Sequence, residues 1–183
     1  EHVPSRPHLA VPDKLNDVQQ PSWLSRRWSS VSRMDPMWEK RNLIRSRYEF
    51  HHNLLNAIKP SVVYDQHPEW FPLINGQHLP KPPDTAHSWQ PCFANHELAT
   101  WVAQRIIEYF DKNPTATSYS LGINDVGAGG YCQCEACQAL DDKSQPTFRD
   151  RPNYSNRVFT FMNRVAAITS QKYPDRLLGC LSY

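Results

Sequence analysis

Hydrophobic and polar positions follow two different periods along this chain. Residues 117–123 alternate between hydrophobic and small or polar side chains, and this period of two predicts a strand. Two short hydrophobic runs, residues 61–64 and 177–181, predict further buried strands. Hydrophobic residues at helical spacing predict three helices, over residues 36–58, 96–110 and 155–172.

The alternation of these helices and strands predicts parallel strands joined by helical crossovers. We therefore expect an α/β fold, a partial (β/α)8 TIM-like barrel, with the three strands as neighbours. Residues 1–183 are expected to form a single partial barrel domain, in which residues 1–36 are an irregular, proline-rich lead-in and residues 37–183 are the barrel units. Because the chain ends at its last predicted strand, we expect a fragment of a larger catalytic domain.

Composition narrows the classes of function. The 183 residues are 39% hydrophobic and 21% charged, which is typical of a globular chain, and no apolar run is long enough for a membrane span. A net charge of +2 with scattered basic residues argues against a nucleic-acid partner. The 16 prolines and 6 tryptophans suit a carbohydrate-handling enzyme, although loop stiffening and core packing account for most of them.

An acidic residue directly follows the central predicted strand. Asn124 and Asp125 end this strand, and a loop with three glycines comes after them. In a barrel fold a carboxylate at this position lies at the mouth of the active site, so Asp125 is the catalytic candidate. Asn124 is a candidate donor to a sugar hydroxyl or acetamido group. The alternative is an Asx turn, in which either side chain bonds to the following backbone.

Four more side chains are candidates for contact with a substrate. His52 lies near the end of the first predicted helix, His67 and Trp70 lie in a polar and aromatic run after the first predicted strand, and Tyr131 follows the glycine-rich loop. Imidazoles bind polar groups, and aromatic rings stack on sugar faces. Ordinary packing explains each of these residues as well, and the residues alone leave both interpretations open.

Three cysteines lie close together in the sequence. Cys132, Cys134 and Cys137 have a spacing that allows three thiolates to face one metal ion, so a structural zinc site is a candidate. Such a site normally has four ligands, and Cys92 or His96 could supply the fourth, although no spacing rule requires either. A disulfide in an oxidising compartment, or simple buried thiols, are the alternatives.

Short motifs along the chain, taken in their order, resemble a known family. They cover nearly all of the chain from Trp38 onward, and they are His67-Pro68-Glu69-Trp70-Phe71 with Asn75-Gly76, Pro91-Cys92-Phe93-Ala94-Asn95, Gly122-Ile123-Asn124-Asp125, Cys132-Gln133-Cys134-Glu135-Ala136-Cys137, Asn163-Arg164-Val165-Ala166 and Tyr173-Pro174-Asp175. The family they resemble is the domain of unknown function DUF4838. Its members include glycoside hydrolase family 163, endo-β-N-acetylglucosaminidases that act on N-glycans.

The resemblance implies a (β/α) barrel catalytic domain in an exported bacterial protein. We therefore expect a secreted, periplasmic or cell-surface location, with the signal outside this chain. The resemblance also implies retaining hydrolysis with the substrate's acetamido group as nucleophile, which uses two carboxylates and no cofactor. Asp125 matches the family's Asn-Asp motif and takes one of these roles, and the second carboxylate is expected beyond Tyr183.

Three interpretations of function thus stay open from the sequence. In the leading one the partners are a glycan substrate and other domains of the full-length chain, with no nucleic acid and no membrane span. In the second, the domain is a non-catalytic glycan-binding relative that lacks a complete carboxylate pair. In the third, it is a structural cysteine-knuckle domain whose partner is another protein.

Overall fold

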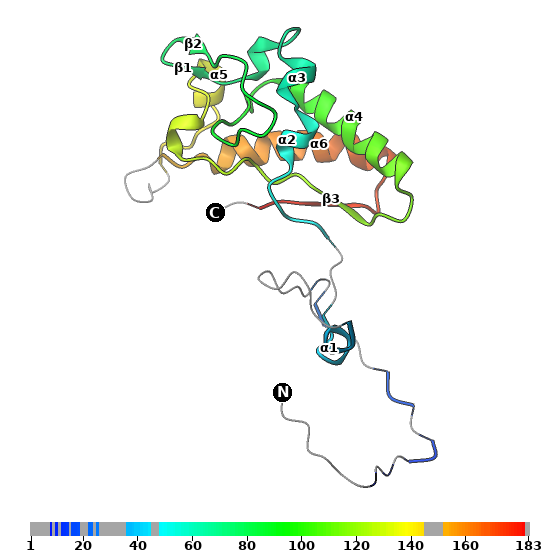
Figure 1. Ribbon diagram of the computed structural model, residues 1–183. Helices are drawn as coiled ribbons and strands as arrows, with labels where there is room; N and C mark the ends of the chain where they lie inside the picture. The colour runs from blue at the N-terminus through cyan, green and yellow to red at the C-terminus, as the bar shows by residue number, and fades with distance from the viewer. Residues whose placement is uncertain are drawn as a thin grey trace. The chain divides into compact units, whose positions relative to one another are not determined.

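The computed structural model describes two separate units of the chain. The described residues are 8, 10, 12–14, 16–18, 22–23, 25, 36–44, 48–144 and 152–181. They divide between a first unit, Glu1–Ser46, and a second unit, Arg47–Tyr183 (Figure 1). Most of the expected irregular lead-in lies outside the described residues. Within the described part, no helix has the length and apolar character needed to cross a membrane.

The first unit contains one described helix, α1 (Pro36–Arg41), which has no buried residue. The second unit holds the other described elements. In chain order these are α2 (Leu54–Ala57), α3 (Pro60–Val63), the 3-10 helix η1 (Pro68–Trp70), β1 (Leu73–Ile74), β2 (Gln77–His78), α4 (His96–Lys112), β3 (Ser118–Ser120), the 3-10 helix η2 (Ala128–Gly130), α5 (Glu135–Gln138), α6 (Ser155–Lys172) and β4 (Leu177–Gly179).

Helices α4 and α6 pack against each other and form the centre of the second unit (Figure 1). The Asn95 side chain caps α4 by accepting a hydrogen bond from the Leu98 backbone N–H at 2.9 Å. Each helix buries one stripe of apolar side chains, which confirms the two amphipathic helices expected from the sequence. The buried stripes consist of Leu98, Val102, Ile106 and Phe110 in α4, and Val158, Phe161, Met162 and Val165 in α6.

Strands β3 and β4 form a parallel pair that lies along one side of these helices (Figure 1). Their register pairs Ser118 with Leu177 and Ser120 with Gly179. Two of the three expected strands are therefore confirmed as parallel neighbours, each shorter than its hydrophobic run. Because α6 lies between them in the sequence, this part of the chain has the β–α–β order expected for an α/β fold.

The expectation of a strand at residues 61–64 is wrong, because residues 61–63 lie in helix α3 and Tyr64 is its C-cap. Pro60 occupies the first helical position, where its fixed φ and missing N–H suit a helix start. Val63 is buried, whereas Val62 is 60% exposed, so the run is not buried on both sides as a central strand would be.

The expectation of one helix over residues 36–58 is also wrong. Helix α1 ends at Arg41, and Leu43 has a left-handed φ of 53° that no helix continues through. Residues 48–53 contain no helix, and His52 forms a parallel bridge with Gly122. The backbone of residues 49–51 instead donates hydrogen bonds to side chains of β3, which lies about 70 residues later in the sequence.

Small residues allow the backbone of residues 49–51 to lie directly on the β3–β4 pair. The backbone N–H groups of Glu49 and His51 donate to the hydroxyls of Ser118 and Ser120, both at 2.7 Å. A Cβ atom at Gly179 would lie 1.7 Å from the Glu49 carbonyl oxygen, so only glycine fits there. This close approach brings residue 52 to the end of β3.

A tight hairpin joins β1 and β2, which are antiparallel. Asn75 and Gly76 both have positive φ, 51° and 78°, as a two-residue hairpin turn of the primed type requires. The Asn75-Gly76 dipeptide is the sequence most typical of such a turn. In the described residues the second unit is a mixed α/β structure with two two-stranded sheets.

Candidate functional site

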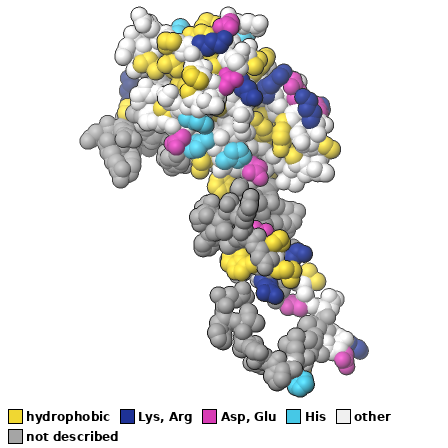
Figure 2. Space-filling view, in the orientation of Figure 1, with side chains coloured by type: hydrophobic (Ala, Val, Ile, Leu, Met, Phe, Trp, Pro, Cys, Tyr) yellow, Lys and Arg dark blue, Asp and Glu magenta, His cyan; other side chains and the backbone are white. Residues whose placement is uncertain are grey.

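Asp125 lies just beyond the carboxyl end of β3, next to an imidazole. Its side chain is 64% exposed, and its Oδ2 is 3.9 Å from Nε2 of His52. Figure 2 shows histidine side chains beside acidic ones on the visible face of the second unit. The structure therefore brings together two residues, His52 and Asp125, that the sequence offered separately.

The orientation of the His52 ring is set by the backbone of the strand. Its Nδ1 is 2.5 Å from the carbonyl oxygen of Ile123. A carbonyl oxygen only accepts hydrogen bonds, so Nδ1 carries the proton and Nε2 is the nitrogen that faces Asp125. A second imidazole, His87, stands edge-on to His52 with ring centroids 6.2 Å apart. The buried Nδ1 of His87 has no hydrogen-bond partner among the described residues.

Asn124 is buried and holds a loop of the protein. Its side-chain nitrogen donates to the Trp89 carbonyl oxygen at 2.7 Å. Its backbone N–H donates to Oε1 of Gln90 at 3.2 Å, and Nε2 of Gln90 donates back to the Asn124 carbonyl oxygen at 2.7 Å. Asn124 thus fixes the loop behind Asp125. The Oδ1 atom of Asn124 is buried without a partner among the described residues.

The other candidates lie in different surroundings. His67 stacks on Trp70 with ring centroids 3.9 Å apart, and Nδ1 of His67 lies 3.0 Å from Oε1 of Glu69. Trp70 is 2% exposed and packs in the core against Trp101, so the structure leaves it no exposed ring face for a sugar. Tyr131 is half-buried and stacks on Tyr154 at 4.0 Å.

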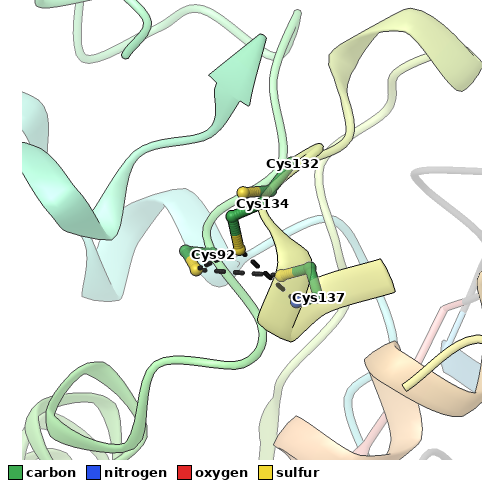
Figure 3. Close-up of side chains that lie close together, drawn as sticks. All are labelled: Cys92, Cys132, Cys134 and Cys137. Atoms are coloured by element: carbon green, nitrogen blue, oxygen red, sulfur yellow. Dashed lines mark hydrogen bonds between the residues drawn. The ribbon is translucent and has the colours of Figure 1, made fainter. Parts of the chain in front are cut away.

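Four cysteines converge at one end of the second unit. Cys92 comes from the loop before α4 and joins Cys132, Cys134 and Cys137 at the start of α5 (Figure 3). The four Sγ atoms all lie within 4.8 Å of one another, and Cys92 is 3.8 Å from Cys134 and 3.7 Å from Cys137. This cluster of four sulfur ligands could bind a metal ion.

A family model for a domain of unknown function, DUF4838, matches residues 1–183. The chain belongs to the DUF4838 family. Searches of curated proteins and of solved structures found no match.

Electrostatics inside the cysteine cluster of this DUF4838 chain favours negative charge on one sulfur. Hydrogen bonds from the thiols of Cys137 and Cys92 lower the pKa of Cys132. The same contacts with Cys132 raise the pKa of Cys92, and they raise the pKa of Cys137 to about 12. The backbone N–H of Leu73 also donates to Sγ of Cys132 at 3.3 Å. The cluster thus stabilises a thiolate, the form of cysteine that binds metals.

A buried arginine supports the same loop of the DUF4838 chain. Arg157 in α6 is 2% exposed, and its Nη1 donates to the Cys132 carbonyl oxygen at 2.6 Å. Its Nε donates to Oδ1 of Asp141 at 2.7 Å, and Nη2 donates to the other carboxylate oxygen. The guanidinium therefore joins the cysteine loop to the central helix pair, with its charge paired.

The sequence analysis missed two residues of these sites and left the place of a third open. Gln90 and His87 lie in a proline-rich loop whose composition gives no signal for the interior. Cys92 was one of two candidates for a fourth ligand, and only the fold places its sulfur in the cluster. The motif Pro91-Cys92-Phe93-Ala94-Asn95, which resembles the family, was the sequence signal that could have indicated a role for this loop.

Proposed function

We propose that this chain is part of a (β/α) barrel catalytic domain of a glycoside hydrolase that cleaves β-linked N-acetylglucosamine in glycans. The observation that carries the proposal is the exposed carboxylate of Asp125, which follows a parallel strand at its carboxyl end and faces a ring nitrogen of His52 at 3.9 Å. Catalytic groups of (β/α) barrels occupy this end of the strands.

The parallel pair supports the barrel part of the proposal. Strands β3 and β4 are joined through α6, and α4 precedes β3 and packs on α6. Repetition of this unit would give the barrel. Residues 48–52 would then be the strand before α4, because His52 already forms a parallel bridge with Gly122, just beyond the end of β3.

The proposed reaction retains the anomeric configuration and uses the substrate as its own nucleophile. The acetamido oxygen attacks the anomeric carbon while the bond from that carbon to the leaving oxygen breaks, and a general acid protonates the leaving oxygen. Water then attacks the anomeric carbon from the face that the leaving group occupied, and the bond from that carbon to the acetamido oxygen breaks while the conjugate base of the general acid takes the proton of the water. Asp125 would accept the acetamido N–H and stabilise the developing positive charge, and His52 would hold this carboxylate in position. The general acid would be a second carboxylate outside this chain.

Further parts of the proposal concern location, partners and metal. The full-length protein would be exported, and its partners would be a glycan and its own other domains. A structural zinc at Cys132, Cys134 and Cys137 would take no part in the chemistry. The two other interpretations, a glycan-binding relative without hydrolysis and a cysteine-knuckle interaction domain, remain as outcomes of the test.

The test is incubation of the full-length protein with N-glycoproteins, followed by mass spectrometry of the released glycans. The parent should release glycans, and Asp125→Asn should reduce release by about a hundredfold or more while glycan binding persists. Asp65→Asn is the matched control, because Asp65 is an exposed carboxylate paired with Lys81. Binding of glycan without its release would favour the glycan-binding relative. A protein that neither binds nor releases glycans would overturn the proposal.

A further inference from the structure

We propose that Cys92 completes a closed tetrahedral Zn²⁺ site with Cys132, Cys134 and Cys137. The site stands independently of the proposed hydrolase activity, because it rests on the arrangement of the four sulfur atoms. Cys92 precedes Cys132 by 40 positions in the sequence, and the fold alone brings it into the cluster.

The distances fit a tetrahedral ion. A tetrahedron with Zn–S bonds of about 2.3 Å has edges of about 3.8 Å. The Sγ atom of Cys92 lies 3.8 Å from that of Cys134 and 3.7 Å from that of Cys137, and no pair of the four exceeds 4.8 Å. Disulfides would instead require sulfur pairs at about 2.05 Å, and this would break the common centre that the four side chains share.

The surroundings of the sulfurs also suit thiolates bound to a metal. The Leu73 backbone N–H donates to Sγ of Cys132 at 3.3 Å, and the Cys137 backbone N–H donates to Sγ of Cys134 at 3.4 Å. Such outer hydrogen bonds orient ligands and offset their charge. Cys92, Cys132 and Cys137 are buried, and Cys134 is partly exposed, which gives an ion a way in. An all-sulfur donor set selects zinc over magnesium or calcium.

A site with four protein ligands is structural, because it leaves no position for water or substrate. On binding, Zn²⁺ displaces the remaining thiol protons to solvent, so metal affinity should rise with pH. The ion would join the loop before α4 to the start of α5. Gln90, two residues before Cys92, bonds to Asn124, so the same loop also supports the backbone beside Asp125.

The test measures metal content and ligand type in the full-length protein. We expect about one zinc per chain by elemental analysis, and tetrahedral tetrathiolate spectra after replacement by Co²⁺ or Cd²⁺. Cys92→Ser should lose most of the zinc, whereas Cys180→Ser should keep it, because Cys180 lies outside the cluster. If Cys92→Ser fails to fold, ¹¹³Cd NMR of the parent still separates four sulfurs from three sulfurs and one nitrogen.

Three results would overturn the inference. The first is a parent protein without zinc whose four thiols react freely or are oxidised to disulfides. The second is a ¹¹³Cd signal typical of a mixed sulfur and nitrogen site, which would point to a histidine as the fourth ligand. The third is full zinc content in a folded Cys92→Ser protein.

Discussion

Gln90 and Asn124 hold each other through a reciprocal pair of hydrogen bonds in the interior. Nε2 of Gln90 donates to the Asn124 carbonyl oxygen at 2.7 Å, and the Asn124 backbone N–H donates to Oε1 of Gln90 at 3.2 Å. Gln90 is 0% exposed and Asn124 is 2% exposed, so water cannot replace either bond. The Gln90 side-chain amide thus pairs with both backbone groups of Asn124, the residue directly before Asp125.

Removal of this amide should destabilise the fold. Gln90→Ala leaves a buried donor and a buried acceptor of Asn124 unpaired, which should lower the free energy of unfolding by about 2 to 3 kcal/mol. Gln104→Ala, at an exposed position of α4, should change it by less than about 0.5 kcal/mol. Urea unfolding measures both. Equal stability of the two variants would show that the paired amide contributes nothing.

The sequence predicted those elements whose signals are local. The apolar stripe and the following Pro174 gave the bounds of α6 as 155–172, the same as in the structure. The alternation in residues 117–123 predicted β3, and the hydrophobic run at residues 177–181 predicted its parallel partner β4. Residues 48–53 could not be assigned in this way, because their partners are the hydroxyls of Ser118 and Ser120 and the carbonyl of Gly122, about 70 residues away.

The candidate sites also divide into residues that a local sequence signal predicts and contacts that only the tertiary structure makes. Asp125 was found because a strand end followed by glycines is a local signal. The contact of Asp125 with His52, the place of Trp70 in the core and the convergence of Cys92 on the other cysteines depend on tertiary packing. No spacing rule along the chain encodes such contacts between distant segments.

Gly179 should not tolerate a side chain. A methyl group there would lie 1.7 Å from the Glu49 carbonyl oxygen, so Gly179→Ala must displace residues 49–51 from the β3–β4 pair. Overpacking of this kind costs about 1 to 3 kcal/mol in unfolding free energy. Gly127→Ala is the matched control, because a Cβ at Gly127 has no atom within 4 Å. A Gly179→Ala protein as stable as Gly127→Ala would contradict the close approach described here.

The stability of the fold should depend strongly on the carboxylate of Asp141, which pairs with the buried guanidinium of Arg157. Asp141→Ala leaves a guanidinium that is 2% exposed without its anion, which should cost about 3 kcal/mol of unfolding free energy. Asp65→Ala removes an exposed partner of Lys81 and should cost at most about 1 kcal/mol. Denaturant unfolding of the two single variants, side by side, checks the difference. Similar losses would mean that the buried pair is no stronger than the exposed one.

Asp84 should make a small part of the stability dependent on acid pH. The hydroxyl and the backbone N–H of Ser61 donate to its carboxylate at 2.6 and 2.8 Å, and these bonds hold the pKa of Asp84 below its ordinary value of 3.8. A pKa lowered by folding adds stability that is present above pH 3.8 and is lost as pH falls through the folded-state pKa.

The melting temperature of the parent should therefore exceed that of Asp84→Asn at neutral pH, and the difference should shrink in acid below pH 3.8. Thermal unfolding of both proteins across this range measures it. Ser61→Ala should give a smaller effect of the same sign, because it removes the hydroxyl donor and keeps the backbone one. A difference that is constant with pH would show that the Asp84 carboxylate is not stabilised in its charged form by folding.

Two substitutions of His52 should separate the roles of its two ring nitrogens, the bond of Nδ1 to Ile123 and the contact of Nε2 with Asp125. In His52→Asn, the side-chain amide can replace Nδ1 as the donor to the Ile123 carbonyl oxygen, whereas His52→Gln places its amide nearer to the position of Nε2. The asparagine variant should therefore keep the parent's unfolding free energy within about 0.5 kcal/mol, and the glutamine variant should lose about 1 kcal/mol with the backbone hydrogen bond. Turnover should show the opposite order, because only the glutamine amide can still face Asp125.

Nitrogen-15 NMR of the parent should find the neutral ring protonated at Nδ1. A ring protonated at Nε2, or an asparagine variant that is less stable than the glutamine one, would mean that the bond to Ile123 does not orient His52.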